Sequence, residues 1–281
     1  MDKISIIIPT FNREKDLKNT IDSIFSCMKP YEIIVVNDFP KRSLKPLNNT
    51  IIINNKSNLG AAGSRNIGAK KASGDILLFL DDDIIVRKNF VEKLKKALIK
   101  KSSVVISSLI YKGDKNFGLN NYLNSRGAAR FKEFMSIKSN YLTTAFLAIY
   151  REDFEKVGGF SEKFKGYGWE DTEFGLKLES RGFLLNIIHT DSIHIHNKNV
   201  EEWSNQLINS GKNLKIIVDN YPMYRDRFNY DILSNKSFSI IFNRITLNIL
   251  IRLSYFFPSR IKFIYRLIFI ISVYLGLNDR D

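Results

Sequence analysis

Short apolar runs alternate with longer amphipathic segments along the first part of the chain. Leu17, Ile21 and Ile24 recur at helical spacing and predict a helix over residues 14–27. Apolar runs predict strands at 4–8 (ended by Pro9), 32–36, 50–53, 75–80 and 104–110, and helices are expected at 61–72 and 87–101. Strands that alternate with helices in this rhythm favour a parallel, doubly wound α/β sheet.

The second half of the chain has a less regular pattern. Residues 113–141 are rich in Gly, Asn and Arg, which predicts a mobile substrate loop. Beyond this loop the pattern predicts a strand at 143–150, a helix from Gly166–Asp171 to about Arg181, short strands at 184–188 and 192–196, and a helix over 200–220 that ends before Pro222.

The last segment is both apolar and basic. Residues 236–281 carry seven Lys and Arg against two Asp, and their longest uncharged apolar run, 267–277, has eleven residues. A membrane-spanning helix needs about twenty. Two basic amphipathic helices hinged at Pro258 suit a membrane interface. A helical hairpin packed on the α/β domain or on a second subunit is the alternative. We therefore expect an α/β domain at 1–220 and a basic amphipathic helical tail at 221–281.

The formal net charge of +14 points to anionic partners. Nucleotide phosphates, nucleic acid and an anionic membrane surface all qualify. A nucleic-acid binder would interleave aromatic and basic residues, whereas the aromatic residues of the tail lie among aliphatic ones, so we expect no nucleic-acid partner. A single cysteine, Cys27, excludes an intramolecular disulfide framework and fits a reducing compartment. The N-terminus begins a strand at once and lacks the apolar region of a signal peptide.

Three consecutive acids, Asp81, Asp82 and Asp83, directly follow the apolar run 76–80. Like charges this close raise a pKa or recruit a cation, and Mg²⁺ and Mn²⁺ take carboxylate oxygens that they share with substrate phosphates. Asp83 as the N-cap of the next helix is the alternative. In doubly wound sheets the ligand lies beyond the carboxyl ends of the strands, where Thr10, Asn12 and Asp38 are also expected.

Six motifs in order resemble the family 2 glycosyltransferases with the GT-A fold. They are residues 6–13 (IIIPTFNR), 33–38 (IIVVND), 58–68 (NLGAAGSRNIG), 79–83 (FLDDD), 158–160 (GGF) and 168–174 (GWEDTEF). One departure is residues 37–40 (NDFP), where the family often reads Asp-Asp-Gly-Ser. The resemblance implies a Rossmann-like, doubly wound mixed α/β sheet, to which this chain adds a C-terminal helical extension.

The resemblance also implies a donor site. Pro9, Thr10 and Asn12 would line the nucleoside base pocket, and Asp38 would accept hydrogen bonds from the base or the ribose. Arg65 would face the nucleotide, with a surface salt bridge as its alternative role. Asp81 and Asp83 would form the Asp-x-Asp pair, one toward the ribose and one toward the metal ion. Asp82 is grouped with the donor-binding residues.

A second acidic centre is implied at Glu170 and Asp171. Asp171 would be the general base and Glu170 would bind acceptor hydroxyls, with helix capping as the alternative role for both. His194 and His196 lie two apart in a strand-like run and project to one face. One of them would complete a Mn²⁺ or Mg²⁺ shell; the spacing from Asp171 favours His196, and a structural histidine is the alternative.

The remaining expectations concern the substrates. Trp169 and Tyr167 would stack on an acceptor sugar or belong to the core. The implied reaction is inverting transfer from a nucleotide sugar, with a UDP-sugar as first expectation, to a hydroxyl of a glycan or lipid-linked acceptor. The expected location is cytoplasmic, peripheral on the inner face of the cell membrane. A catalytically silent nucleotide-sugar or surface-binding protein is the alternative. A sugar nucleotidyltransferase would need a Gly-x-Gly-Thr-Arg loop where Pro9–Asn12 stands. Oligomeric state, donor base and acceptor stay open.

Overall fold

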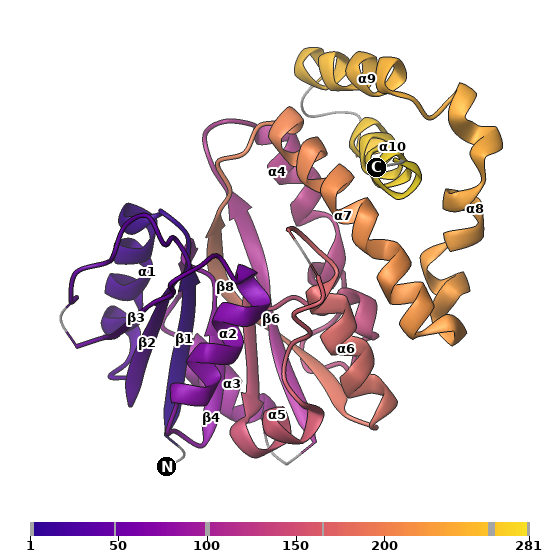
Figure 1. Cartoon of the computed structure of the whole chain (residues 1–281). Helices are drawn as coiled ribbons and strands as arrows, with labels where there is room; N and C mark the ends of the chain where they lie inside the picture. Colours follow the sequence, from indigo (N-terminus) through magenta and orange to yellow (C-terminus); the bar gives the residue numbers. More distant parts are fainter. Residues whose placement is uncertain (1–2, 48, 99–101, 165, 258–261, 280–281) are drawn as a thin grey trace. The chain divides into compact units, whose positions relative to one another are not determined.

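The structure is a computed structural model, and it describes residues 3–47, 49–98, 102–164, 166–257 and 262–279. Figure 1 shows its helices and strands. The chain divides into two compact units. The sheet unit comprises Met1–Tyr111, Arg126–Glu162 and Glu170–Ile195, and the helical unit comprises Lys112–Ser125, Lys163–Trp169 and His196–Asp281. The expected functional division at residue 220 stays a prediction.

One eight-stranded sheet forms the sheet unit, in the order β3-β2-β1-β4-β7-β6-β8-β5. β1, β2, β3 and β4 are parallel, β7 is antiparallel to both β4 and β6, and β5 is antiparallel to β8. The doubly wound mixed sheet is therefore confirmed. The strands are β1 (Ile4–Thr10), β2 (Glu32–Asn37), β3 (Ile51–Asn54), β4 (Ile76–Leu80), β5 (Ile84–Ile85), β6 (Ser103–Lys112), β7 (Phe146–Tyr150) and β8 (Leu184–Ile195).

Strand β1 continues through Pro9, where the sequence predicted its end. The backbone oxygen of Thr10 accepts from Asp38 N on the β2 side, so the peptide groups of Pro9 face the β4 side. The ladder with β4 has already ended at the Ile7–Phe79 pair, so the missing N–H of proline costs no sheet hydrogen bond there. β1 therefore carries Thr10 to the ligand edge of the sheet.

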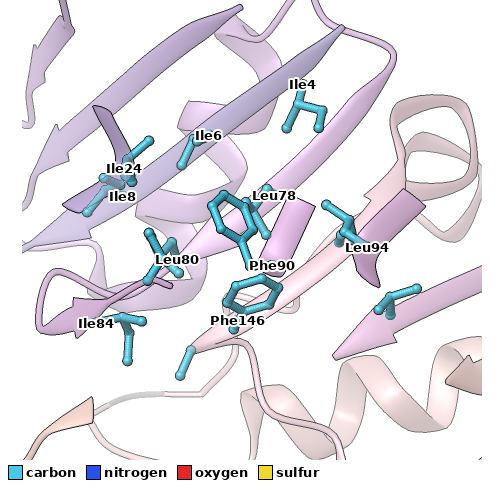
Figure 2. Packing of buried hydrophobic residues seen from close by; sticks show 14 of the residues in the cluster. Ile4, Ile6, Ile8, Ile24, Leu78, Leu80, Ile84, Phe90, Leu94 and Phe146 are labelled. Atoms are coloured by element: carbon cyan, nitrogen blue, oxygen red, sulfur yellow. The ribbon is translucent and has the colours of Figure 1, made fainter. Parts of the chain in front are cut away.

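Helices cover both faces of the sheet. α1 (Glu14–Cys27) and α3 (Phe90–Ala97) pack on one face and contribute to the core shown in Figure 2. α2 (Gly60–Lys71), α5 (Arg151–Val157) and α6 (Glu170–Ser180) bury their apolar residues on the other. Because both faces are covered, β4 is apolar and buried along its whole length, and charged side chains appear only where it ends.

Three predicted elements differ from the structure. α3 starts at Phe90, three residues later than expected, and residues 99–101 lie outside the described residues. The segment 113–141 holds α4 (Phe117–Asn124) and the short 3₁₀ helices η1 (Gly127–Arg130) and η2 (Ser139–Tyr141), not one loop. The two short strands expected after residue 183 are one strand, β8, which passes Asp191 in a left-handed conformation (φ 55°).

The helical unit contains α7 (Val200–Asn220), and helix α10 (Lys262–Asn278) packs along it in Figure 1. A Cβ placed on Gly276 of α10 would lie 1.8 Å from Ile208 O of α7, so the two backbones touch directly. The remaining elements are η3 (Pro222–Phe228), α8 (Tyr230–Ser234), η4 (Lys236–Ile240), α9 (Arg244–Phe256) and α10 (Lys262–Asn278).

The two expected tail helices are therefore present as α9 and α10, but α10 is a core element of its unit. Pro258, the expected hinge, and Arg260 lie outside the described residues. Across the part of the chain that the structure describes, no helix combines the length and the apolar content needed to span a bilayer.

Candidate active site

The three acids that follow β4 point to different partners. Asp82, buried at 5% exposure, accepts from Thr10 Oγ1 at 2.6 Å and from Arg13 Nη1 at 3.0 Å. Its backbone oxygen accepts from Thr20 Oγ1 of α1. Burial raises the pKa of Asp82 to about 7, against the opposing effect of Arg13. Asp82 thus ties β1 and α1 to the end of β4, and its expected contact with the donor stays a prediction.

Asp83 lies between a guanidinium and an imidazole. Arg13 Nη1 donates to Asp83 Oδ2 at 2.7 Å, and His194 Nε2 of β8 lies 3.2 Å from Asp83 Oδ1. Burial alone would raise the pKa of Asp83, but His194 and Arg13 hold it well below its usual range. The capping alternative for Asp83 is wrong, because strand β5 follows it and Asn89 precedes α3.

The two candidate histidines have different surroundings. The ring of Tyr111 lies against that of His194 with centroids 5.0 Å apart and the ring planes tilted by 32°. Burial, followed by the charges of Asp81 and Asp83, raises the pKa of Tyr111 to about 12. His196 belongs to the helical unit, where its Nδ1 pairs with Asn120 Oδ1 at 3.0 Å. His194 is therefore the histidine that the structure places beside an Asp-x-Asp carboxylate.

Arg65 of α2 joins the two acidic centres. Its Nη2 donates to Asp81 Oδ1 at 2.8 Å, and its Nη1 lies 3.9 Å from Glu170 Oε1 and 3.8 Å from Asp171 Oδ1. Arg65 is only 4% exposed, so its alternative role as a surface salt bridge is wrong. Its Nε and Nη1 have no hydrogen-bond partner among the described residues. Buried N–H groups of this kind suit phosphate, ribose or carboxylate oxygens.

Glu170 and Asp171 open helix α6, and each has a distinct environment. Asp171 Oδ1 accepts from Thr144 Oγ1 at 2.5 Å, and its Oδ2 accepts from Thr144 N at 3.1 Å. Glu170 Oε2 is buried and has no hydrogen-bond partner among the described residues. Burial, then the charge of Asp171, raises the pKa of Glu170 to about 7. Burial also raises the pKa of Asp171, although Arg65 opposes it.

Asp38 is already engaged with its own chain. Its carboxylate accepts from Asn55 Nδ2, Leu59 N and Gly60 N at 2.8–2.9 Å and so holds the start of α2. A carboxylate offers about four acceptor sites, which leaves room for one more donor. The expected contact of Asp38 with the nucleoside stays a prediction.

A partly open hollow lies at the carboxyl ends of β1 and β2. Phe39, which stands where the family often has glycine, packs edge-on against Phe11 at 5.0 Å. The hollow is lined by Thr10, Asn12, Arg13, Glu14, Asn37, Phe39, Arg42 and Leu44. Two of the three residues expected at the base pocket, Thr10 and Asn12, line this hollow, whereas Pro9, the residue before Thr10 in β1, is not among the lining residues.

Tyr167 and Trp169 lie in the helical unit. Lys198 Nζ sits 5.6 Å above the Tyr167 ring, and Trp169 packs edge-on against Phe228 at 5.4 Å. Trp169 has a left-handed backbone (φ 77°) directly before Glu170. Non-glycine residues in this conformation are uncommon and gather at functional sites. The expected contact of Tyr167 and Trp169 with an acceptor stays a prediction.

Asp83 and His194 are the side chains of this site that could hold a divalent ion. Across the described residues, no group of three or more His, Cys, Asp or Glu is placed to hold a metal ion. Asp83 Oδ1 is nevertheless buried and faces the imidazole of His194, and this pair fits Mn²⁺. Two protein ligands are enough where substrate phosphates supply others.

Three site residues had no role assigned from the sequence. Arg13 is in the first motif, but nothing local in the sequence shows that it reaches Asp82 and Asp83. Thr144 orients Asp171 from a segment 27 positions away. Tyr111 contacts the ring of His194 from β6. Only the folded sheet brings these side chains to the same edge.

Comparison with known proteins agrees with this geometry. The family model for glycosyl transferase family 2 matches residues 5–158, and a model described as the N-terminal domain of galactosyltransferase matches residues 128–198. An uncharacterised glycosyltransferase, YwdF of Bacillus subtilis, is 39% identical over 102 residues, which are 34% of this chain and 38% of YwdF. An uncharacterised glycosyltransferase of Haemophilus influenzae is 29% identical over 185 residues, 62% of this chain and 61% of the relative. The chain thus spans less than two thirds of either relative.

Solved structures share the fold at low sequence identity. GalNAc-T7 with UDP, GalNAc and Mn²⁺ aligns with a TM-score of 0.57 at 16% identity, over 76% of this chain and 48% of that one. TarS 1–349 of Staphylococcus aureus with UDP aligns with a TM-score of 0.53 at 19% identity, over 74% of this chain and 64% of the TarS chain. These neighbours confirm the expected GT-A fold. Since the family model covers more than half of the sequence, the chain belongs to glycosyl transferase family 2.

Proposed function

We propose that this protein transfers a sugar from a nucleotide-sugar donor to an acceptor hydroxyl. The observation that carries the proposal is the convergence on Arg65 of Asp81, from the end of β4, with Glu170 and Asp171, from the start of α6. A proposed donor-binding acid and a candidate base thus share one buried cation. Chondroitin synthase of Pasteurella multocida, 24% identical over 79% of this chain and 28% of the relative, supports a glycosyl-transfer role.

The proposed donor is a UDP-sugar. The hollow lined by Thr10 and Asn12 would take the base, with Pro9 beside it and Asp38 near the ribose. Two solved neighbours contain UDP, whereas a mannosyltransferase from Pyrobaculum calidifontis contains GDP-Man and Mn²⁺. A GDP-sugar is therefore the first comparison in any donor screen. Asp81 and Asp82 complete the proposed donor contacts.

A divalent ion, Mn²⁺ or Mg²⁺, is the proposed cofactor. Asp83 and His194 would hold it, and Asp81 lies in the same acidic turn. When bound, such an ion neutralises negative charge on the diphosphate as it leaves. His196 remains a second candidate: its Nδ1 pairs with Asn120 Oδ1, and its Nε2 would be the ligand atom. The Mn²⁺ in two solved neighbours supports this choice of cofactor.

Asp171 is the proposed general base. Thr144 holds both of its oxygens in place, so the carboxylate is oriented before any acceptor arrives. It would accept the proton of the acceptor hydroxyl while that oxygen bonds to the anomeric carbon and the bond to the diphosphate breaks. One direct displacement inverts the anomeric centre. Glu170 would bind acceptor hydroxyls through its unpartnered Oε2, and Tyr167 and Trp169 would stack on the acceptor sugar.

The proposed acceptor is a glycan or a lipid-linked sugar. The proposed location is cytoplasmic, peripheral on the inner face of the cell membrane, without a nucleic-acid partner. The excess of Lys and Arg after residue 235 supports that location, because anionic lipid headgroups attract basic segments.

A nucleotide screen followed by a transfer assay tests the proposal. UDP, GDP, dTDP and CDP are added with Mn²⁺, and the unfolding temperature is compared with a sample containing EDTA. A ligand well above its Kd should stabilise the protein by about 2–4 kcal/mol. Binding without sugar release from the matching donor would favour the silent binder. Binding of none of the four nucleotides would overturn the donor site.

A further inference from the structure

Helix α9 in the helical unit is apolar on two opposite sides. Leu247, Ile251 and Ser254 are buried, and α9 packs on α10. On the other side Ile245, Ile249, Leu253 and Phe256 are 72%, 52%, 38% and 78% exposed. Their spacing of four, four and three residues puts them in one stripe, into which Arg252 also falls. These five residues are called the outer face of α9.

Exposed apolar side chains continue on either side of this helix. Ile240 and Ile241 precede it at 85% and 59% exposure, and Phe257 and Phe263 follow at 51% and 63%. Single exposed apolar residues are ordinary, but a contiguous series marks an interaction surface. The exposed side chains therefore call for a partner with an apolar layer.

The charge of the same segment narrows the choice of partner. From residue 236 to residue 278 the sequence contains six Lys and Arg and no Asp or Glu. The five of them that the structure describes are all exposed, and none forms an ion pair within the described part of the chain: Lys236, Arg244, Arg252, Lys262 and Arg266. Positive charge beside exposed apolar residues, without any acid, complements an anionic surface.

We propose that the outer face of α9 binds an anionic lipid bilayer, with the helix lying flat at the level of the headgroups. Its apolar stripe would enter the acyl boundary while Arg252 and its neighbours meet lipid phosphates. A second copy of the chain is a poor occupant, because two such faces would bring like charges together. This inference rests on the proposed peripheral location, but it does not depend on the transfer chemistry.

The composition of the tail suggests that both of its helices face a membrane, but helix α10 packs inside the helical unit. Its apolar residues, among them Ile268 and Ile271, are buried, and Ser272 Oγ lies 3.0 Å from Ser204 Oγ of α7. α10 therefore supports α9 within the helical unit, and the lipid surface is assigned to α9.

Vesicle co-sedimentation of the full chain tests the proposal with two pairs of substitutions. Phosphatidylcholine vesicles with and without phosphatidylglycerol are the probes. Ile245→Gln with Ile249→Gln removes apolar area without adding charge, and we expect roughly tenfold weaker binding. Arg244→Gln with Arg252→Gln should weaken binding to the anionic vesicles about fivefold per charge removed, and the loss should shrink at high salt.

Matched controls use residues elsewhere on the surface. Met223→Gln with Ile232→Gln removes exposed apolar side chains from η3 and α8, and Lys15→Gln with Lys18→Gln removes two charges from α1. Both pairs should bind vesicles as the unmodified chain does. The unfolding temperature and UDP binding of every variant show that the fold is intact.

The possible outcomes are separable. If the unmodified chain binds anionic vesicles and the α9 variants bind them equally well, the assigned surface is overturned but the peripheral location is kept. No binding of the unmodified chain to anionic vesicles at low salt overturns both, while the transfer assay with a soluble acceptor still judges the chemistry. A change of size in solution on α9 substitution, without a change in vesicle binding, identifies a second copy as the occupant and overturns the proposal.

Discussion

Arg65 Nη2 lies 2.8 Å from Asp81 Oδ1, and this contact is the link between the two acidic centres of the sheet unit. The buried guanidinium favours the ionised forms of Glu170 and Asp171. Burial opposes that effect, and the pKa values of both acids are still raised. The balance leaves Glu170 able to lose and regain a proton near pH 7.

Arg65→Met should destabilise the fold by about 3 kcal/mol, because removing one partner of a buried ion pair leaves uncompensated charge. Urea unfolding at neutral pH measures the change. Lys96→Met is the matched control, since Lys96 pairs with Glu92 on the exposed side of α3 and should leave the midpoint unchanged. Equal midpoints for both variants would show that the acids near Arg65 do not depend on it.

Asp83→Asn should abolish Mn²⁺-dependent nucleotide binding while the chain stays folded, because the two side chains are nearly the same size. Isothermal calorimetry with UDP, with and without Mn²⁺, gives the result. Asp22→Asn on the exposed side of α1 is the control. Unchanged Mn²⁺-dependent affinity in Asp83→Asn would remove Asp83 from the metal site.

Asp171→Asn should keep donor affinity and reduce kcat by about 10² to 10⁴, the usual contribution of a general base. Glu170→Gln is the informative comparison, since it alters the neighbouring acid and leaves the Thr144 contacts of Asp171 in place. A normal rate in Asp171→Asn with a large loss in Glu170→Gln would transfer the role of base to Glu170.

The rate should rise with pH through the pKa of Asp171. A general base works in its ionised form, and burial raises the pKa of Asp171 above the usual range of an aspartate, so the rise should come at higher pH than for an exposed aspartate. The kcat/KM profile measures this, and Asp171→Asn should flatten its acid limb. A profile that stays flat down to the usual pKa range of an exposed aspartate would contradict the assignment.

The free energy of unfolding, in contrast, should decrease as the pH rises from about 4.5 to about 7. Glu170 keeps its proton in the folded chain up to about pH 7, whereas the unfolded chain releases it near 4.5. The folded state therefore binds more protons between these values, and its contribution to stability is lost as pH rises through 7. Thermal unfolding of Glu170→Gln, which cannot ionise, should depend less on pH in this interval.

The product should have the inverted anomeric configuration. A single displacement by the acceptor oxygen converts an α-linked donor to a β-linked product, and a β-linked donor to an α-linked one. The coupling constant of the anomeric proton, measured by NMR before spontaneous equilibration, decides the matter. Retention would argue against direct displacement with Asp171 as the base.

Local sequence patterns predicted the bounds of two helices correctly. α1 and α7 have the predicted bounds, and α7 starts with a capping box between Asn199 and Glu202. The acids at the end of β4 were visible because a buried strand carries charge only where it leaves the core. The helix α4 was missed because it is only eight residues long within a glycine- and asparagine-rich segment.

The site itself was predictable only in part. The acids and Arg65 stand in motifs, but their pairing depends on strand order, which no local pattern contains. His194 faces Asp83 because β8 runs antiparallel to β5, with Ile84 opposite His194. That register, rather than the distance along the chain from Asp171, places one histidine beside the carboxylate.

The direct contact between α7 and α10 also sets where the chain tolerates change. Gly276 faces Ile208 O and Gly211 faces Val273 O with no room for a methyl group, so even alanine at either position would push the helices apart. Such variants should therefore accumulate to lower levels in cells, because more of the protein is degraded.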